Sequence, residues 1–148
     1  MNVRMKNPLE VLNVFPAVQN LQAPIYQSGL PAELLGYVGL RVSQMTNCEF
    51  GIKQAFVRAE GNGTALKRLP QVQGWKTSAA FSSTERIALE LAEAVTELKD
   101  GYNSLTDKLW SSVEEHFNEQ ESAALLLFIS AMNMFVRLNV ATRRLTTD

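Results

Sequence analysis

The sequence predicts an all-α protein with six to eight helices, and three observations lead to this prediction. Apolar residues recur every three or four positions along most of the chain, as they do on helices with one buried face. Residues that start or end helices separate these segments, for example Asn7-Pro8 and the Gly-Asn-Gly sequence at 61–63. No stretch shows sustained alternation with β-branched residues, so no strand is expected.

Shorter helices are expected in the first half of the chain. Asn7 followed by Pro8 is a typical start of a first helix, and Pro16 is placed to open a second one. The segment 31–46 then carries apolar residues at helical spacing, which predicts one buried stripe. These apolar residues are Leu34, Leu35, Val38, Val42 and Met45.

Two further helices are expected before position 70. Asn47 is a good N-cap residue, which would put Cys48 at the first position of a helix that ends at 61–63. Thr64 is placed to cap a short helix that Pro70 breaks. The sequence therefore predicts that its only cysteine lies at the start of a helix.

The second half of the chain predicts three longer helices. The first begins at Ser82, which has a glutamate three residues later as in a capping box, and it continues to position 98. The second spans about 106–117. The third begins at Asn118 with the same capping-box spacing and runs to about position 143.

The longest apolar stretch lies within the last of these helices. Ala123–Val136 has 14 residues and includes Ser130 and Asn133. A bilayer span needs about 20 apolar residues, so this stretch predicts a central core helix and no membrane partner. We expect it to be the most buried segment of the protein.

Composition indicates an ordinary soluble domain that spans residues 1–148. Hydrophobic residues make up 46% and charged residues 20%, and the formal net charge is −1. No basic stripe is present, so nucleic acid is not an expected partner. The N-terminus has no signal-peptide pattern, and the single cysteine excludes an internal disulfide, so a cytoplasmic location is expected.

Three long segments resemble the alkylhydroperoxidase AhpD / carboxymuconolactone decarboxylase-like family. They are GLPAELLGYVGLRVSQMTNCEFG at 29–51, GWKTSAAFSSTERIALELAEAVTEL at 74–98, and the segment 105–144, with its Asn133, Arg137, Leu138 and Asn139 pattern. The resemblance implies a multi-helix bundle that assembles into homo-oligomers. It also implies a thiol-dependent peroxidase, an antioxidant oxidoreductase that uses no cofactor.

The chain departs from the family's peroxidase motif at three of its four positions. That motif is a glutamate, eleven residues, C-x-x-C, three residues and a histidine. Cys48 occupies the first cysteine position, while Gly36, Gly51 and Ala55 stand in place of the glutamate, the second cysteine and the histidine. In the family's mechanism the second cysteine attacks the peroxide and the glutamate and histidine relay its proton. Only the resolving-type cysteine remains here.

Cys48 therefore has two interpretations. A helix N-terminus lowers the pKa of a thiol, whereas the adjacent Glu49 opposes thiolate formation. Without a second thiol, any sulfenic acid would need an external thiol as reductant. The alternative, which we favour, is a small buried side chain at a helix junction.

Other polar residues also have a functional and a structural interpretation. Arg41, Ser43 and Gln44 lie in an otherwise apolar helix, where they could line a pocket with Tyr37 or Cys48, or bond helix ends or a neighbouring subunit. The second possibility is favoured. His116 is the only histidine and has no partners at ligand spacing, so no metal site is expected.

These observations favour an AhpD-like protein with a decayed redox site, which acts as a non-redox or very weakly active homo-oligomeric binding or scaffold protein. The large apolar side chains expected to be shared between subunits are Phe15, Tyr26, Trp75, Phe81, Trp110 and Phe135. The alternative is a one-cysteine peroxidase that uses Cys48 and an external thiol. A weaker alternative is a carboxymuconolactone decarboxylase-like lyase, for which Ala55 removes the obvious base.

Overall fold

The computed structural model describes residues 1–146, and over this range it contains helices and no strands. The α-helices within this range are α1 Pro8–Val11, α2 Phe15–Tyr26, α3 Ala32–Met45, α4 Glu49–Arg58, α5 Gly63–Arg68, α6 Ser83–Glu97, α7 Asp107–His116 and α8 Glu119–Thr142. Two 3-10 helices, Leu69–Gly74 and Gly101–Ser104, connect them. The all-α prediction is confirmed.

The helix starts follow the predicted caps at most positions. Ser82 and Glu85 form a complete capping box at α6, and the side chain of Asn118 accepts a hydrogen bond from the backbone N–H of Glu121 at α8. Thr106 caps α7 in the same way, by accepting from Leu109. Each cap satisfies an N–H group that the first helical turn leaves without a partner.

Two predicted caps are wrong by one or two residues. Asn47 lies before the start of α4 in a left-handed conformation (φ 51°), and Cys48 is the N-cap residue. Asn62, not Thr64, caps α5. Asparagine tolerates the left-handed region better than most residues, so Asn47 is used to turn the chain between α3 and α4 and is not available as a cap.

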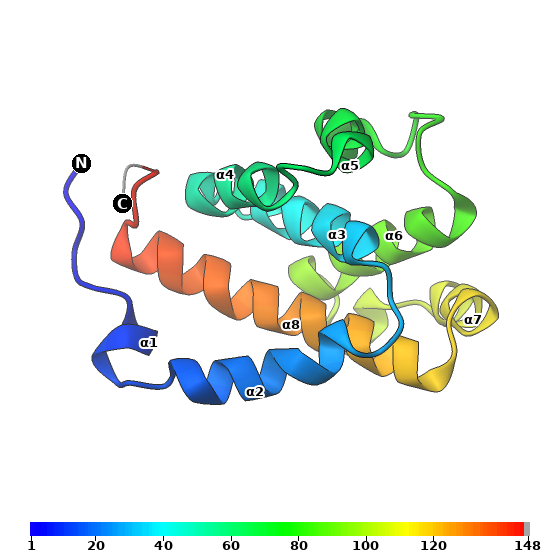
Figure 1. Cartoon of the computed structure of the whole chain (residues 1–148). Coiled ribbons are helices and arrows are strands. Elements are labelled where there is room, and N and C mark those ends of the chain that lie inside the picture. Colours follow the sequence, from blue (N-terminus) through cyan, green and yellow to red (C-terminus); the bar gives the residue numbers. More distant parts are fainter. Residues whose placement is uncertain (147–148) are drawn as a thin grey trace.

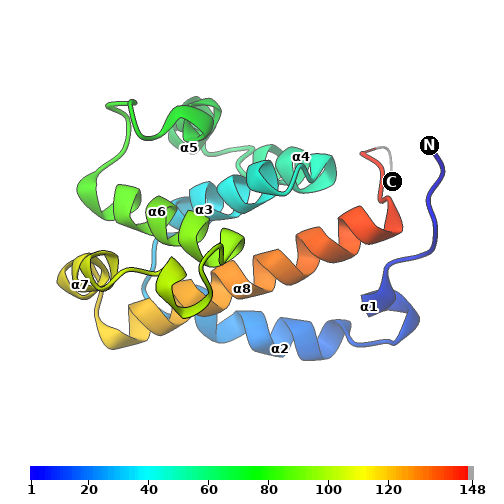
Figure 2. The same ribbon diagram turned by 180° about the vertical axis from the view of Figure 1, so that it is seen from behind.

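Helix α3 is the centre of the molecule. It packs most extensively against α4, α6 and α8, and Figures 1 and 2 show it between α6 and α4 with α8 running alongside. Helix α2 lies against α8 on the side away from α4 and α5 (Figure 1). The rings of Phe128 on α8 and Tyr26 at the end of α2 make a T-shaped contact, with ring centres 6.4 Å apart.

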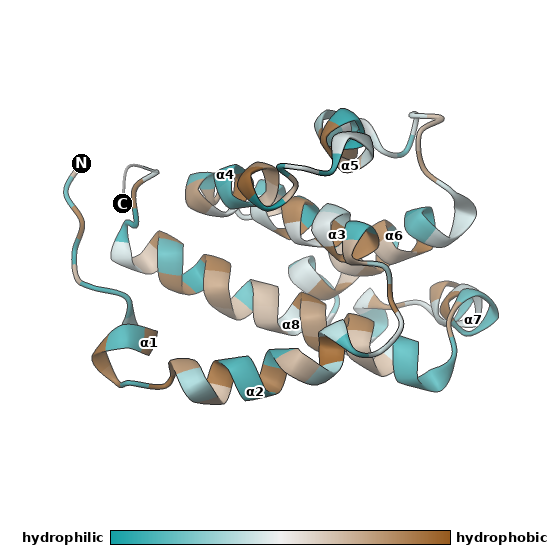
Figure 3. Cartoon of the chain, viewed as in Figure 1, coloured by the Kyte–Doolittle hydropathy of each residue, from teal (hydrophilic) through white to brown (hydrophobic). Residues whose placement is uncertain are grey.

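Helix α8 is less buried than predicted. By length and composition it could cross a membrane, yet it packs as a core helix against α2, α3 and α6. One stripe of it remains exposed, with Leu127 40% and Met134 37% accessible. Figure 3 shows apolar residues of α8 interspersed with hydrophilic ones along the helix.

The most buried helix in the single chain is α3, and the prediction for Ala123–Val136 is wrong at this level. Between 34 and 43 only Gly36 and Arg41 are not fully buried. The reason is geometric: α3 has neighbours on all sides, whereas α8 has none along the stripe that contains Leu127 and Met134.

Candidate functional site

The three positions at which the peroxidase motif is replaced lie together in space. Gly36 on α3 and Gly51 and Ala55 on α4 line one cavity of about 210 Å³. Leu40, Phe128 and other apolar side chains from α3, α5 and α8 form most of its remaining wall. The sequence positions of the motif thus define a real cavity, and none of the three carries an ionisable group.

Cys48 does not line this cavity, although its sulfur would lie 3.3 Å from a Cβ atom at the lining residue Gly51. Its side chain is 2% exposed and belongs to the main hydrophobic cluster. As the N-cap of α4, its Sγ accepts a hydrogen bond from the backbone N–H of Gly51 at 3.4 Å. The two cations that could have favoured a thiolate have other partners, because Arg41 pairs with Glu93 and Lys53 with a backbone carbonyl near the C-terminus.

Gly51 is enclosed by its neighbours. A Cβ atom at this position would collide with the Ser43 hydroxyl and would come within 3.1 Å of Ser43 Cβ and 3.3 Å of Cys48 Sγ. Ser43 is fully buried, and its hydroxyl donates to the Gly39 carbonyl at 3.0 Å. A side chain at position 51 therefore needs Ser43 to move first. Gly36 differs, since an added Cβ would meet nothing within 4 Å.

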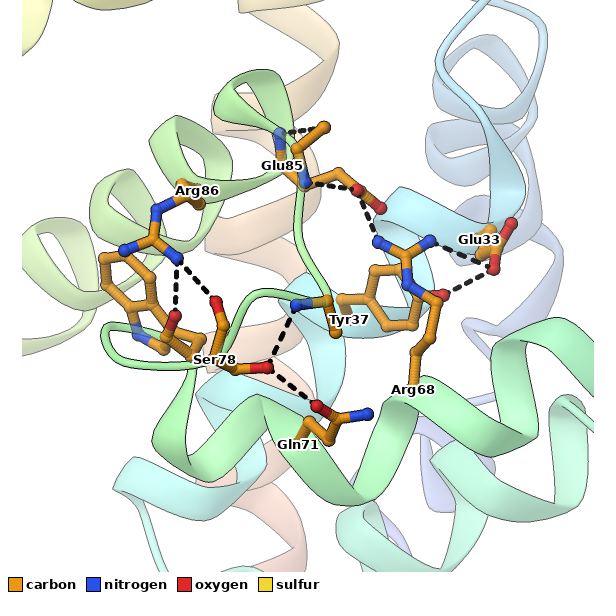
Figure 4. A network of polar contacts seen from close by, with 10 residues as sticks. Glu33, Tyr37, Arg68, Gln71, Ser78, Glu85 and Arg86 are labelled. Atoms are coloured by element: carbon orange, nitrogen blue, oxygen red, sulfur yellow. Dashed lines mark hydrogen bonds and ion pairs between the residues drawn. The ribbon is translucent and has the colours of Figure 1, made fainter.

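A polar network borders the cavity at Tyr37, the one member of the predicted polar group that lines it (Figure 4). The Tyr37 hydroxyl donates to the Glu33 carboxylate. Arg68 bridges Glu33 at 3.5 Å and Glu85 at 2.5 Å, and its guanidinium lies 4.8 Å from the centre of the Tyr37 ring. The network ties α5 to α3 and to the start of α6.

Burial and ion pairing shift the acidity of this network. Burial, followed by the hydrogen bond to Glu33, raises the pKa of Tyr37 above its ordinary value, so the phenol stays protonated. Burial alone would raise the pKa of Glu85, but the hydrogen bonds from Arg68 and from Ser82 outweigh it and lower that pKa. Arg68 Nε is buried without a hydrogen-bond partner, and the Glu33 carboxylate, which lines the cavity, accepts from Tyr37 and pairs with Arg68.

The sequence did not indicate Arg68, Glu33 or Glu85 as partners. Seventeen residues separate Arg68 from Glu85 and thirty-five separate it from Glu33, so no local spacing could have linked them. The sequence indicated Glu85 only as part of the capping box at the start of α6, and that box does form.

The remaining predicted polar residues serve packing between helices. Arg41 Nε and Nη2 donate to Glu93 at 3.1 and 2.9 Å, while Nη1 donates to Gln44 at 3.3 Å. Trp75 Nε1 also donates to Glu93, at 3.2 Å. Arg41 and Gln44 do not line the cavity. Of the polar residues predicted to line a pocket, only Tyr37 lies at the cavity with the replaced motif positions.

The side chains of Asn133 and His116 both have hydrogen-bonding partners within the chain. Asn133 Nδ2 donates to Thr96 Oγ1 at 3.0 Å, which joins α8 to α6. His116 Nδ1 lies 2.7 Å from the Ser112 carbonyl one turn earlier. Within residues 1–146 no three His, Cys, Asp or Glu side chains are grouped as metal ligands would be.

The helical arrangement and the cavity place the chain in the AhpD-like structural class. A crystal structure from Agrobacterium tumefaciens, described as a protein of unknown function proposed to be the antioxidant defence protein AhpD, superimposes with a TM-score of 0.86 over 97% of both chains. The two sequences are 22% identical, so this likeness establishes the fold. The predicted AhpD-like fold is thus confirmed.

The chain belongs to the same family as the uncharacterized protein YdfG of Bacillus subtilis. The two are 30% identical over 115 residues, which cover 78% of this chain and 77% of YdfG. The uncharacterized protein YnjA of Escherichia coli is 33% identical over 116 residues, which cover 78% of this chain and 62% of YnjA. No family model matches the chain.

Proposed function

We propose that this protein is a non-redox, homo-oligomeric binding protein on an AhpD-like fold. One observation carries the proposal: Gly36, Gly51 and Ala55 line a single cavity, and these three positions offer neither a thiol nor the glutamate and histidine of a proton relay. Such a cavity is suited to holding a small molecule or a partner group and not to transforming it.

The chemistry of peroxide reduction supports the same conclusion. A thiolate must reach the peroxide, and a nearby base must take its proton. Cys48 is 2% exposed, belongs to the main hydrophobic cluster and is not among the residues that line the cavity. Positioned acids and bases contribute about 10²–10⁴-fold to such reactions, and the cavity wall holds none at positions 36 and 55.

Exposed apolar residues support the homo-oligomer. Of the aromatic residues expected to be shared between subunits, Trp75 and Phe81 are buried within the chain, whereas Phe15 and Tyr26 are 45% and 51% exposed. Leu127 on α8 is exposed as well. Symmetric association is the usual way for a soluble protein to cover such residues.

Peroxide turnover tests the non-redox proposal. Purified protein is incubated with cumene hydroperoxide and dithiothreitol, and hydroperoxide loss is compared between the native chain and Cys48→Ser. We expect both to match the protein-free rate. Multiple turnovers that Cys48→Ser abolishes would establish the alternative, a one-cysteine peroxidase that uses an external thiol, and would overturn the proposal.

A further inference from the structure

A second cavity, of about 280 Å³, lies between α2, α4 and α8. It adjoins the first, because Gly51, Arg58 and Met132 line both. Its apolar wall comes mainly from α2 and α8 and includes three phenylalanines. The apolar residues that line it are Leu9, Phe15, Val18, Phe50, Met132, Phe135, Val136 and Leu138.

The charged residues of this second cavity are all basic. Arg58 and Arg144 line it, and no aspartate or glutamate of the described residues does. The Arg58 guanidinium makes no hydrogen bond or ion pair with the rest of the described chain, residues 1–146. The Arg144 guanidinium lies 3.8 Å from the centre of the Phe50 ring, and no carboxylate within the same residues pairs with it. Two cations thus face one cavity, and no anionic side chain of residues 1–146 lies there with them.

Uncharged hydrogen-bonding groups surround these cations. The side-chain amides of Gln22, Gln54 and Asn139 line the cavity, and none of them is hydrogen-bonded within the described part of the chain. Amide N–H groups and guanidinium groups are donors that suit the oxygens of an anion. The cavity therefore combines an apolar wall with a cluster of free donors.

We infer that this second cavity binds a small amphipathic carboxylate. The carboxylate would lie at Arg58 and Arg144, where the planar guanidinium groups can bind both oxygens. The apolar body would lie against the phenylalanine side chains. A cavity of about 150 Å³ is known to hold benzene, so 280 Å³ accommodates a chain of about eight carbons. The inference deepens the proposed function and rests on it in taking the chain as a binding protein.

Calorimetric titration with three matched eight-carbon probes tests the inference. We expect octanoate to bind saturably, with octanamide and octylammonium weaker by roughly tenfold or more, because hydrogen bonds to charged groups are the stronger ones. Raising the salt concentration should weaken octanoate binding and leave octanamide unchanged. Equal binding of the three probes, or preference for octylammonium, would overturn the inference.

Variants locate the binding site. Arg58→Gln and Arg144→Gln should each weaken octanoate roughly three- to tenfold and leave octanamide unaffected. Lys108→Gln on α7 removes the same charge far from the cavity and should change nothing. Gln22→Trp should fill the cavity and abolish binding. Unchanged octanoate affinity in both arginine variants would overturn the site.

The two proposals fail in distinguishable ways. Absence of octanoate binding together with absence of peroxide turnover overturns only the ligand assignment. Turnover that depends on Cys48 overturns the non-redox proposal, whatever the octanoate titration shows.

Discussion

At the scale of single residues, Ser43 decides what position 51 can hold. Both Gly36 and Gly51 lie in helices and line the same cavity, yet their surroundings are opposite. The space next to Gly36 is open, while the space next to Gly51 is occupied by a buried serine that is hydrogen-bonded to the Gly39 carbonyl. Gly36 and Gly51 look alike in the sequence, but only at Gly51 does a neighbouring side chain leave no space for a Cβ atom.

Alanine substitution at each glycine separates these reasons. Gly36→Ala should raise the free energy of unfolding by about 0.5–1 kcal/mol, because alanine favours the helix and meets no neighbour. Gly51→Ala should lower it by about 1–3 kcal/mol, because Ser43 must shift. Urea denaturation of both variants and the native chain measures the difference. Equal effects in the two variants would contradict this account of Ser43.

The pairing of Glu85 with Arg68 predicts a pH dependence. Because the folded-state pKa of Glu85 is lowered, its stabilising contribution is present above the unfolded-state pKa of a glutamate and is lost as the pH falls through the folded-state pKa. Glu85→Gln retains capping-box geometry but removes the charge. We expect a loss of about 1 kcal/mol at pH 7 that largely disappears at about pH 3.

Urea denaturation at the two pH values measures this loss. Glu97→Gln, at the exposed end of the same helix, is the control for charge alone. A loss of the same size at both pH values would contradict the assignment to the ion pair.

At the scale of elements, helix α8 has two different faces. One packs on α3, α6 and α2, and the other exposes Leu127 and Met134 one above the other along the helix. Residues seven apart lie on the same side of a helix, so these two form a stripe and not scattered contacts. We assign this stripe to contacts between subunits in the proposed homo-oligomer.

Charge placed on the stripe should therefore separate the subunits. The double variant Leu127→Glu/Met134→Glu is expected to reduce the particle to the 16.5 kDa of one chain, because a buried carboxylate is costly at an interface. Light scattering coupled to gel filtration measures the mass. Tyr102→Glu, on a fully exposed side chain of the 3-10 helix Gly101–Ser104, is the control and should keep the native mass. A native chain that already runs at 16.5 kDa would contradict the proposal.

At the scale of the whole molecule, a peroxidase on this fold requires groups from two helices to meet at one cavity. The structure brings the positions 36, 51 and 55 together but has packed Ser43 and Cys48 around Gly51. A cysteine side chain at position 51 therefore has no space while Ser43 keeps its present position. Restoring the motif by substitution therefore requires a change at Ser43 in addition to the three motif positions.

A restoration series tests that statement. The triple variant Gly36→Glu/Gly51→Cys/Ala55→His should remain without turnover, or turn over only slowly, because Ser43 obstructs the new cysteine. Adding Ser43→Gly should open the space and raise hydroperoxide consumption by at least about tenfold over the triple variant. The rate is followed with dithiothreitol as reductant. High activity in the triple variant itself would contradict the role given to Ser43.

The sequence by itself determined the helical class, most helix boundaries and the AhpD-like resemblance. Periodicity and caps are local properties: Ser82 with Glu85, and Asn118, interact within one turn of their own helix, so their effect can be predicted without a partner. The motif spacing identified positions 36, 51 and 55 as those that correspond to the family motif, and the structure adds that they line one cavity.

Tertiary structure decided the rest. The order of burial, with α3 above α8, depends on how many helices surround each one, which no single segment encodes. The obstruction of Gly51 by Ser43 and the presence of Arg58 and Arg144 at one cavity also depend on the packing of separate helices. Their geometry exists only once the helices have packed.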